Sequence, residues 1–388
     1  MKARILDKLC CPFCLGDLTL HAFVEESVKH LQYSPCEVER GETAIGDGHE
    51  RVIKEGVLLC QQCKIWYPIY SYVPIMLTFE TDLHKRLAQE YTRQFSWLSE
   101  YRMPNGSPEP GEQSIQETFT DEWNYVQDDE LSFVYSIDDL KLLHRNVLLK
   151  WMEYSEEKIG NILDIGCGIG HESISLQEVT DHAEIFAIDL NFAVLKGGEA
   201  YKSRPYLHLI ISSLFHLPLK PASFDLVYSQ GVIHHTFCTV KAFKSIASYV
   251  RQGGYLTLWI YGTGDHLARI EDLGSLVRLV YMAECFLRPV ISRSPKVIRN
   301  IFFGIVATIC HPVIKKMVRH QEKWKIANTM HSMRDWLSHK YVHRHTYNEV
   351  FEWFENAGFR IIGVQSPSAY RQLFQKRLWG IGVTGKKF

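Results

Sequence analysis

The most constraining feature of this sequence is a short apolar run that leads directly into three closely spaced glycines. The run is Asn161–Ile165, and Gly166, Gly168 and Gly170 follow it in a G-x-G-x-G pattern before a helical segment. Glycine is needed where the backbone takes a positive φ or comes close to a ligand. This order of strand, glycine turn and helix predicts the first unit of a parallel α/β sheet, with a ligand at the turn.

Further apolar runs alternate with helical segments along the C-terminal part of the chain, which is the rhythm of a parallel sheet. The predicted strands are, in chain order, Asn161–Ile165, Glu184–Asp189, Leu207–Ser212, Phe224–Ser229, Tyr255–Tyr261, Phe359–Gln365 and Gly380–Thr384. A long insertion at residues 264–340 separates the fifth strand from the sixth. We therefore expect an α/β domain built from residues 159–263 and 341–388.

Two acids accompany the glycine turn. Asp164 precedes the first glycine by two residues, and Asp189 ends the second predicted strand. The dinucleotide fingerprint is spaced G-x-G-x-x-G instead and uses its helix N-terminus to hold an anionic pyrophosphate. S-adenosylmethionine has no phosphate and carries a sulfonium cation, so acids beside the loop suit it better. A carboxylate at Asp189 can accept hydrogen bonds from both ribose hydroxyls, each worth about 1.5–3 kcal/mol.

This pattern resembles the class I S-adenosylmethionine-dependent methyltransferases over roughly residues 140–263 and 340–388. The resemblance implies a Rossmann-like, seven-stranded methyltransferase sheet. It assigns cofactor binding to Asp164, Gly166, Gly168, Gly170, Asp189, Ser213, Leu214 and Gln230. The family usually has an acid where Ser213 stands, to bind the adenine amino group; serine is a departure, although its hydroxyl can still accept a hydrogen bond. A degenerate Rossmann domain that binds no cofactor is the alternative.

The segment after the fourth predicted strand bears on the methyl acceptor. Family members that act on planar amide or base nitrogens usually carry Asn/Asp-Pro-Pro-Tyr there, whereas this chain has Ser229–Val232. Oxygen or carbon acceptors are therefore favoured. His234 and His235 follow at the end of the strand where such sheets bind ligands, and either histidine could act as a general base, with His235 preferred. The alternative is that the pair caps the next helix without a catalytic role.

Two cysteine pairs lie in the N-terminal block, residues 1–79. Cys11 and Cys14 form one C-x-x-C knuckle, and Cys60 and Cys63 form another. Two such knuckles supply the four thiolates of a closed tetrahedral zinc site, which predicts a structural Zn²⁺. Bound zinc can contribute about 10–16 kcal/mol to the folding of a small module. A redox dithiol or incidental buried cysteines are the alternatives.

The ten cysteines are clustered and the N-terminal segment lacks an apolar signal-peptide region, so we expect a reducing, cytoplasmic location. The N-terminal block resembles the zinc-ribbon activator subunit that partners tRNA, ribosomal and release-factor methyltransferases. The motifs that carry this resemblance are Leu9–Leu18 and Cys60–Leu77. In that family the ribbon covers an apolar surface of its methyltransferase. The resemblance therefore implies that the cover acts in cis here.

Two oppositely charged stretches complete the chain. Residues 100–139 carry eleven acids and one base, within an expected acidic linker and helical cap at 80–158. Residues 273–320 carry eight bases and one acid, within an expected helical lid at 264–340 that prolines break into pieces. The basic stretch either covers the acceptor pocket and faces the acidic stretch, or makes peripheral membrane contact. A transmembrane helix is disfavoured, because the apolar run Ile301–Ile314 has only fourteen residues.

Three functions remain open after these observations. The favoured one is a methyltransferase that modifies an oxygen or carbon of a small-molecule, carbohydrate or lipid-like acceptor. The second is an RNA (tRNA) methyltransferase that carries its activator in cis; the net charge of −1, from 43 bases and 44 acids, provides no global attraction for RNA. The third is a non-catalytic zinc-ribbon adaptor. The sequence leaves the oligomeric state open.

Overall fold

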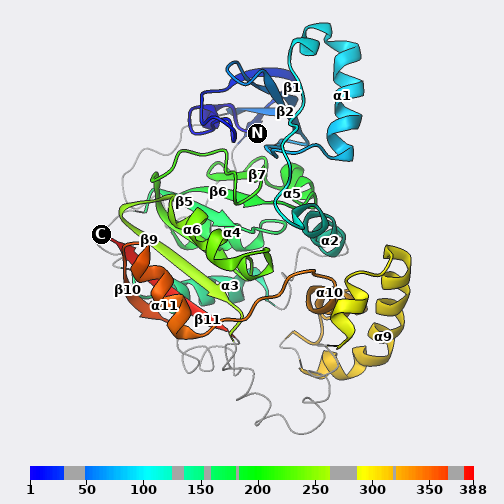
Figure 1. Ribbon diagram of the computed structural model, residues 1–388, viewed down its shortest axis with the longest axis vertical. Coiled ribbons are helices and arrows are strands. Elements are labelled where there is room, and N and C mark those ends of the chain that lie inside the picture. Colours follow the sequence, from blue (N-terminus) through cyan, green and yellow to red (C-terminus); the bar gives the residue numbers. More distant parts are fainter. Residues whose placement is uncertain are drawn as a thin grey trace.

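The computed structural model describes residues 1–29, 49–124, 135–152, 159–180, 183–262, 286–317, 320–365 and 380–388. These residues form a small N-terminal sheet, a larger central sheet and a helical lobe to one side (Figure 1). The expected α/β class, the seven-stranded methyltransferase-type sheet and the small N-terminal β domain are all confirmed.

The N-terminal domain is a four-stranded antiparallel sheet in the order β1-β2-β3-β4. Its elements are the 3₁₀-helix η1 (Ala3–Asp7) and strands β1 (Thr19–Lys29), β2 (His49–Cys60), β3 (Ile65–Tyr70) and β4 (Val73–Pro74). Helix α1 (Asp82–Gln94) and the 3₁₀-helix η3 (Ser96–Glu100) follow, and Thr81 caps α1 by accepting from the His84 amide. Leu87 and Tyr91 of α1 are buried, as their helical spacing predicts.

The central sheet has the strand order β10-β11-β9-β8-β5-β6-β7. Its strands are β5 (Asn161–Ile165), β6 (Glu184–Asp189), β7 (Leu207–Ile211), β8 (Phe224–Gln230), β9 (Val250–Ile260), β10 (Phe359–Val364) and β11 (Ile381–Lys387). Strand β11 runs antiparallel to both β9 and β10, and the remaining pairs are parallel. Each predicted strand is present, although β9 begins five residues before the expected Tyr255.

Helices cover both faces of this sheet. They include α3 (Ile137–Leu143), which continues as a π-helical turn η4 (His144–Leu148), and α4 (His171–Val179), α5 (Val194–Tyr201), α6 (Thr239–Ala247) and α11 (Tyr347–Asn356). Alternate residues of β5 enter two different cores, since Leu163 and Ile165 pack on one face and Ile162 on the other. This burial on both faces explains why the strands read as continuous apolar runs.

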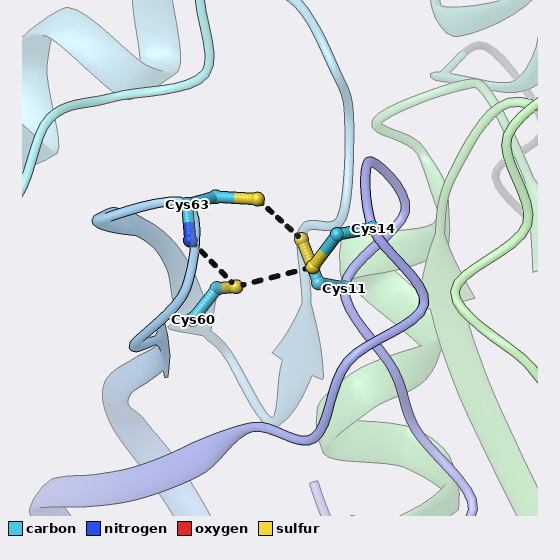
Figure 2. A group of neighbouring side chains, drawn as sticks. All are labelled: Cys11, Cys14, Cys60 and Cys63. Carbon is cyan, nitrogen blue, oxygen red and sulfur yellow. Dashed lines mark hydrogen bonds between the residues drawn. The ribbon is translucent and has the colours of Figure 1, made fainter.

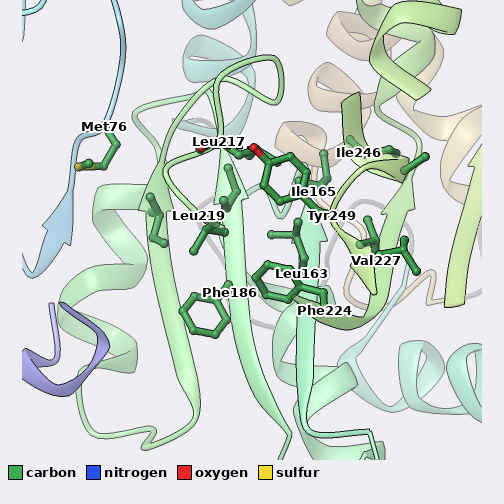
Figure 3. Packing of buried hydrophobic residues seen from close by; sticks show 14 of the residues in the cluster. Met76, Leu163, Ile165, Phe186, Leu217, Leu219, Phe224, Val227, Ile246 and Tyr249 are labelled. Carbon is green, nitrogen blue, oxygen red and sulfur yellow. Dashed lines mark hydrogen bonds between the residues drawn. The ribbon is translucent and has the colours of Figure 1, made fainter. Parts of the chain in front are cut away.

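The N-terminal domain is joined to the edge of the central sheet. Beyond β4, Ile75 pairs in parallel with Ile211 of the edge strand β7, and the Met76 amide donates to the Ile211 carbonyl at 2.7 Å. On the other side of the ribbon, the Cys10 amide donates to the Pro218 carbonyl at 2.9 Å. Met76 shares one buried cluster with Leu163 of the central sheet (Figure 3). The ribbon therefore covers this sheet edge in cis.

The helical lobe contains α2 (Glu112–Asn124), α9 (Lys296–Met317) and α10 (Ile326–Leu337). Helix α10 packs between α9 and α2, and α9 lies outermost (Figure 1). The expectation that prolines break the insertion is wrong for Pro312, because α9 runs through it as one helix of 22 residues. Helix α9 is therefore longer than the fourteen-residue apolar run Ile301–Ile314 on which the argument against a transmembrane helix rested. By length and composition, α9 is long and apolar enough to cross a membrane.

Candidate functional site

The glycine turn between β5 and α4 has the backbone that only glycine adopts easily. Gly166, Gly168 and Gly170 have φ values of 82°, 59° and 100°. A Cβ atom built on Gly168 would lie 2.8 Å from the ring of Trp123, which reaches over the loop from α2. The three glycines therefore form a tight turn, here called the glycine cradle, whose backbone neighbouring side chains approach closely.

Asp189 lies at the end of β6, directly beside this cradle. Its Oδ2 accepts from the Gly168 amide at 2.8 Å, and its Oδ1 accepts from the Asn191 amide at 2.9 Å. Burial raises the pKa of this carboxyl. Each carboxylate oxygen has a second lone pair, so the pair can still accept from the two hydroxyls of a ribose.

Asp164 is fully enclosed behind the turn, and the Ser173 hydroxyl of α4 donates to it. Burial raises the pKa of Asp164 to about 7 and that of Glu172, the second residue of α4, to about 8. Repulsion adds to both shifts: Asp189 raises the pKa of Asp164, and Asp164 raises the pKa of Glu172. Three neighbouring acids without a cation between them make the cradle complementary to a positively charged ligand.

Gln230 ends β8 on the same side of the sheet. Its Oε1 lies 2.7 Å from the Tyr228 hydroxyl, and its Nε2 lies 3.4 Å from Glu172 Oε1. The Tyr228 hydroxyl also lies 2.8 Å from Glu172 Oε2 and 3.0 Å from His144 Nε2. Gln230 and Glu172 are thus held together as a pair of oxygen-bearing groups at the mouth of the cradle.

Ser213 and Leu214 follow β7 on the opposite side of Asp189. The Ser213 hydroxyl oxygen accepts from the Phe215 amide at 3.1 Å, and the Leu214 carbonyl accepts from the Ser245 hydroxyl at 2.6 Å. The Ser213 hydroxyl also hydrogen-bonds the buried carboxylate of Glu112, at the start of α2. Helix α2 thus brings the acid Glu112 to Ser213, the position at which class I methyltransferases usually have an acid of their own.

The two candidate histidines occupy the 3₁₀-turn η5 (Ile233–His235) after β8. Both are buried, and burial lowers the pKa of each well below its usual value, so both rings are neutral at pH 7. His235 Nδ1 lies 3.1 Å from the Tyr341 carbonyl, which can only accept, so Nδ1 carries the proton and Nε2 remains basic. The rings of His234 and Tyr261 lie against each other in a tilted arrangement, with their centroids 4.0 Å apart.

A cluster of acids and histidines from the helical lobe surrounds His235. Glu122 of α2 lies 2.9 Å from the ring nitrogen Nε2 of His339, and Asp335 of α10 accepts from the Tyr261 hydroxyl at 3.2 Å. Burial raises the pKa of Glu122, raises that of Asp335 to about 7 and lowers that of His339 to about 4, so these groups favour their neutral forms. They line a buried polar site.

This polar site adjoins His235 through one aromatic ring. Phe119 stacks on His339 with centroids 3.9 Å apart and meets the His235 ring edge-on at 5.5 Å. Glu122, Asp335 and His339 also lie close enough together to hold one metal ion.

The four predicted zinc ligands converge at one point of the ribbon (Figure 2). The Cys14 and Cys60 sulfurs lie 3.6 Å apart and the Cys11 and Cys63 sulfurs 4.0 Å apart. Tetrahedral Zn–S bonds of about 2.3 Å require sulfur separations of about 3.8 Å, so the cluster fits Zn²⁺. The four cysteines are free thiols. Cys10 is buried outside the cluster, and Cys36 lies outside the described residues.

Each knuckle is closed by the residue that follows its second cysteine. Leu15 has a φ of 57° and Lys64 a φ of 53°, so both take the left-handed conformation although neither is glycine. The Leu15 amide donates to the Cys11 carbonyl at 2.8 Å, and the Cys63 amide donates to the Cys60 sulfur at 3.3 Å. The two turns therefore share a left-handed residue after their second cysteine, although their hydrogen bonds differ.

Two family models match the chain. A model described as a methyltransferase domain matches residues 163–258, which include the glycine turn, Asp189 and the histidine pair. A model described as Trm112p-like protein matches residues 2–70, which include all four clustered cysteines. The chain contains a methyltransferase domain and an N-terminal Trm112p-like domain.

The curated relatives match this chain over only part of its length and of their own. An uncharacterised protein of Synechococcus sp. is 25% identical over 231 residues, 58% of this chain and 52% of its own. The malonyl-[acyl-carrier protein] O-methyltransferase of Legionella pneumophila is 26% identical over 165 residues, 37% of this chain and 56% of its own. The chain thus spans about half the length of the curated relatives it matches.

Solved structures of similar fold include a complex of the Haloferax volcanii Trm112 methyltransferase activator with a putative methyltransferase. Its TM-score is 0.38 at 12% identity, covering 64% of this chain and 92% of that chain. A second is the Burkholderia thailandensis 1,6-didemethyltoxoflavin-N1-methyltransferase, with a TM-score of 0.41 at 14% identity, covering 73% of this chain and 92% of that chain.

Sequence reasoning missed several residues that line the site of the methyltransferase domain. They come from α2, α4 and α10, and they are Glu112, Glu122, Trp123, Glu172, Asp335 and His339. Glu172 was within reach, because it follows the last glycine of the turn by two residues. The others lie far from the glycine turn in sequence, and nothing in their local pattern shows that α2 and α10 fold back over it.

Proposed function

We propose that this protein transfers the methyl group of S-adenosylmethionine to a hydroxyl oxygen of a small-molecule, carbohydrate or lipid-like acceptor. The observation that carries the proposal is the group of three carboxyls, Asp164, Glu172 and Asp189, around the glycine cradle. Burial raises the pKa of each. A sulfonium nucleoside would stabilise the ionised carboxylates, whereas a dinucleotide would bring two more negative charges.

The cradle offers a partner for each polar part of the cofactor. Asp189 can accept from the ribose hydroxyls, and Glu112 with Ser213 can accept from the adenine amino group. Glu172 and Gln230 can accept from the α-ammonium group. S-adenosylmethionine, when bound, supplies a methyl group on a sulfonium cation, an electrophile that an acceptor oxygen can attack directly. The protein must then align the acceptor, exclude water and remove a proton.

His235 is suited to remove that proton. Its Nδ1 proton is held by the Tyr341 carbonyl, and its low pKa keeps Nε2 unprotonated at pH 7. The acceptor's hydroxyl proton would pass to Nε2 as the oxygen attacks. Glu122, Asp335 and His339 provide hydrogen-bonding groups for the rest of the acceptor. An oxygen acceptor is also in line with Ser229–Val232 standing where nitrogen-directed family members have Asn/Asp-Pro-Pro-Tyr.

In the N-terminal domain we propose a structural Zn²⁺ bound by Cys11, Cys14, Cys60 and Cys63. Four protein thiolates leave no coordination position for a substrate or water, so this ion has no catalytic part. Its function is to hold the two knuckles together and, through them, the strand that covers β7.

The proposal predicts which product carries the label when a cell extract is treated with the protein and a deuterium-methyl cofactor. We expect the wild-type protein to label a hydroxyl compound, detected by mass spectrometry. His235→Gln should lower the labelling about 10²- to 10⁴-fold, because proton removal contributes that much. Its cofactor affinity, measured by isothermal titration, should stay within about twofold of wild type.

The exposed His49, at the start of β2, provides the control, and His49→Gln should label as the wild type does. Label on a carboxylate, or full activity of His235→Gln, would show that no base is needed and contradict the hydroxyl acceptor. Label in tRNA, together with strongly salt-dependent tRNA binding, would support the RNA alternative instead.

A second prediction concerns the pH dependence of cofactor binding. Asp164 and Glu172 have raised pKa values of about 7 and about 8, so part of each is protonated near neutral pH. A bound cation favours the ionised forms, so binding releases protons and strengthens as the pH rises from ~6 to ~8.5. S-adenosylhomocysteine lacks the sulfonium charge and should show a smaller dependence. Calorimetric titrations in buffers of different ionisation enthalpy measure the affinity and the number of protons released for each ligand. An equal pH dependence of affinity for the two ligands would contradict the electrostatic argument.

A further inference from the structure

The outer face of α9 is apolar and exposed. Val297, Ile301, Ile305, Ile309 and Val313 recur every four residues, and their exposed fractions lie between 58% and 70%. The neighbouring residues that extend this patch are Ile298, Val290, Leu287 and Phe286. Nine of the seventeen large exposed hydrophobic residues in the described part of the chain therefore lie between residues 286 and 313. A patch of this kind marks a surface that something covers.

The inner face of α9 makes the contacts with the rest of the protein. Phe303 and Ala307 are buried against α10, and the Arg334 guanidinium lies over the Phe303 ring. Asn300 accepts from Arg334 at 3.2 Å, on the same side of the helix. His311, one turn beyond Ala307, lies 2.8 Å from the Thr329 hydroxyl. The inner face of this helix thus mixes apolar and polar groups, whereas its outer face is aliphatic and exposed.

The charge around the patch has a single sign. The stretch from Phe286 to Lys316 contains no aspartate or glutamate, and its basic residues are Arg288, Arg293, Lys296, Arg299, Lys315 and Lys316. Lys296 is paired with Asp121 of α2 at 2.6 Å. The two lysines at the C-terminal end are adjacent, and Lys316 is exposed. Arg293, Lys296 and Lys316 are the exposed ones among these six basic residues. An apolar helix face whose flanking sequence is basic is complementary to a layer whose interior is apolar and whose surface is anionic.

We propose that α9 lies along the surface of an anionic lipid membrane, with Val297, Ile301, Ile305, Ile309 and Val313 in the interfacial layer. The helix does not cross the membrane, because its inner face is packed on α10 and carries Asn300 and His311, which would otherwise have to enter hydrocarbon. A second copy of the chain is a poorer occupant, because it would bring six more basic residues against the first six. Basic amphipathic helices bind membranes in this manner.

Helix α10 connects the polar site to the helix that contacts the membrane. Helix α10 packs on α9 and also carries Asp335, which lies in the polar site beside His235. Membrane binding would therefore hold that site close to the lipid surface. The proposal itself depends only on α9 and stands whether or not methyl transfer occurs.

Flotation with lipid vesicles tests the proposal on the full-length protein. We expect wild-type protein to float with vesicles of phosphatidylcholine and phosphatidylglycerol and to bind pure phosphatidylcholine more weakly. Raising the salt to ~0.5 M should reduce binding to the anionic vesicles. The double variant Ile305→Glu and Ile309→Glu should lose at least about tenfold in vesicle affinity, because two charges then enter the apolar face.

Val24→Glu is the matched control, since Val24 is an exposed aliphatic residue of β1 outside the patch. It should float as the wild type does. Unchanged cofactor affinity and far-ultraviolet circular dichroism would show that the double variant is folded. The proposal is overturned if the protein floats with neither kind of vesicle or if the double variant still binds. It is also overturned if the membrane-bound protein resists alkaline carbonate extraction, which indicates a transmembrane helix. A wild-type dimer in lipid-free buffer that the double variant converts to a monomer would show that the patch is a dimer interface instead.

Discussion

Replacement of Cys60 by serine is expected to release the bound metal and to unfold the N-terminal domain. The four sulfurs meet at separations of 3.6 and 4.0 Å, and each knuckle is closed by a left-handed residue that a loose loop would not retain. Zinc can contribute about 10–16 kcal/mol to modules of this kind, more than the total stability of many domains. Elemental analysis should find about one zinc per wild-type chain and markedly less in Cys60→Ser.

The loss should extend beyond the ribbon. Ile75 and Met76 pair with the edge strand β7, and buried residues of the ribbon and of the central sheet belong to one cluster. Without the ribbon, that edge and its apolar neighbours would be exposed to pairing with other chains. We therefore expect Cys60→Ser to lower the melting temperature of the whole protein and to cause aggregation.

Cys10→Ala provides the control for this prediction, because Cys10 is buried next to the cluster but lies outside it. It should retain zinc and lose only the small packing contribution of one sulfur. Metal content that survives in Cys60→Ser, or a chelator-treated protein that melts at the temperature of the untreated one, would show that zinc does not hold this domain together.

The central sheet could be predicted because the parallel strands β5, β6, β7 and β8 are buried almost throughout. These four strands read as largely apolar runs, and all seven strands appear within a few residues of their predicted ends, apart from the earlier start of β9. The glycine turn and the cysteine knuckles could be predicted for a different reason. Their chemistry requires particular residue types at short, fixed spacings.

Helix α2 could not be predicted in the same way, because its buried face is polar. Glu112, Gln116, Thr118 and Glu122 are its buried residues, and the two glutamates contact Ser213 and His339 of the site. A search for an apolar stripe therefore fails. Helix α9 is the opposite case, since its apolar stripe faces outward, and the expectation that Pro312 would end it was wrong. Contacts with α10 on the inner face, such as His311 to Thr329, support the helix around the proline.

Replacement of Asp189 by alanine is expected to abolish measurable cofactor binding. The carboxylate lies at the end of β6 and orders the glycine turn through the Gly168 amide. In the proposed function it also accepts from the ribose hydroxyls. Two charge-assisted hydrogen bonds of about 1.5–3 kcal/mol each would be lost. The dissociation constant should therefore rise about 10²- to 10⁴-fold in isothermal titration.

Because Asp189 also supports the turn, a second variant separates binding from folding. Asp189→Asn retains an oxygen that can accept from the Gly168 amide, so its melting temperature should stay near that of the wild type. Because it removes the negative charge, it should still weaken S-adenosylmethionine binding by more than about tenfold. The exposed Asp138 of α3 is the matched control, and Asp138→Ala should bind normally. If the cofactor binds to both Asp189 variants with wild-type affinity, the ribose does not lie at β6, and the assignment of the cradle to a cationic nucleoside is wrong.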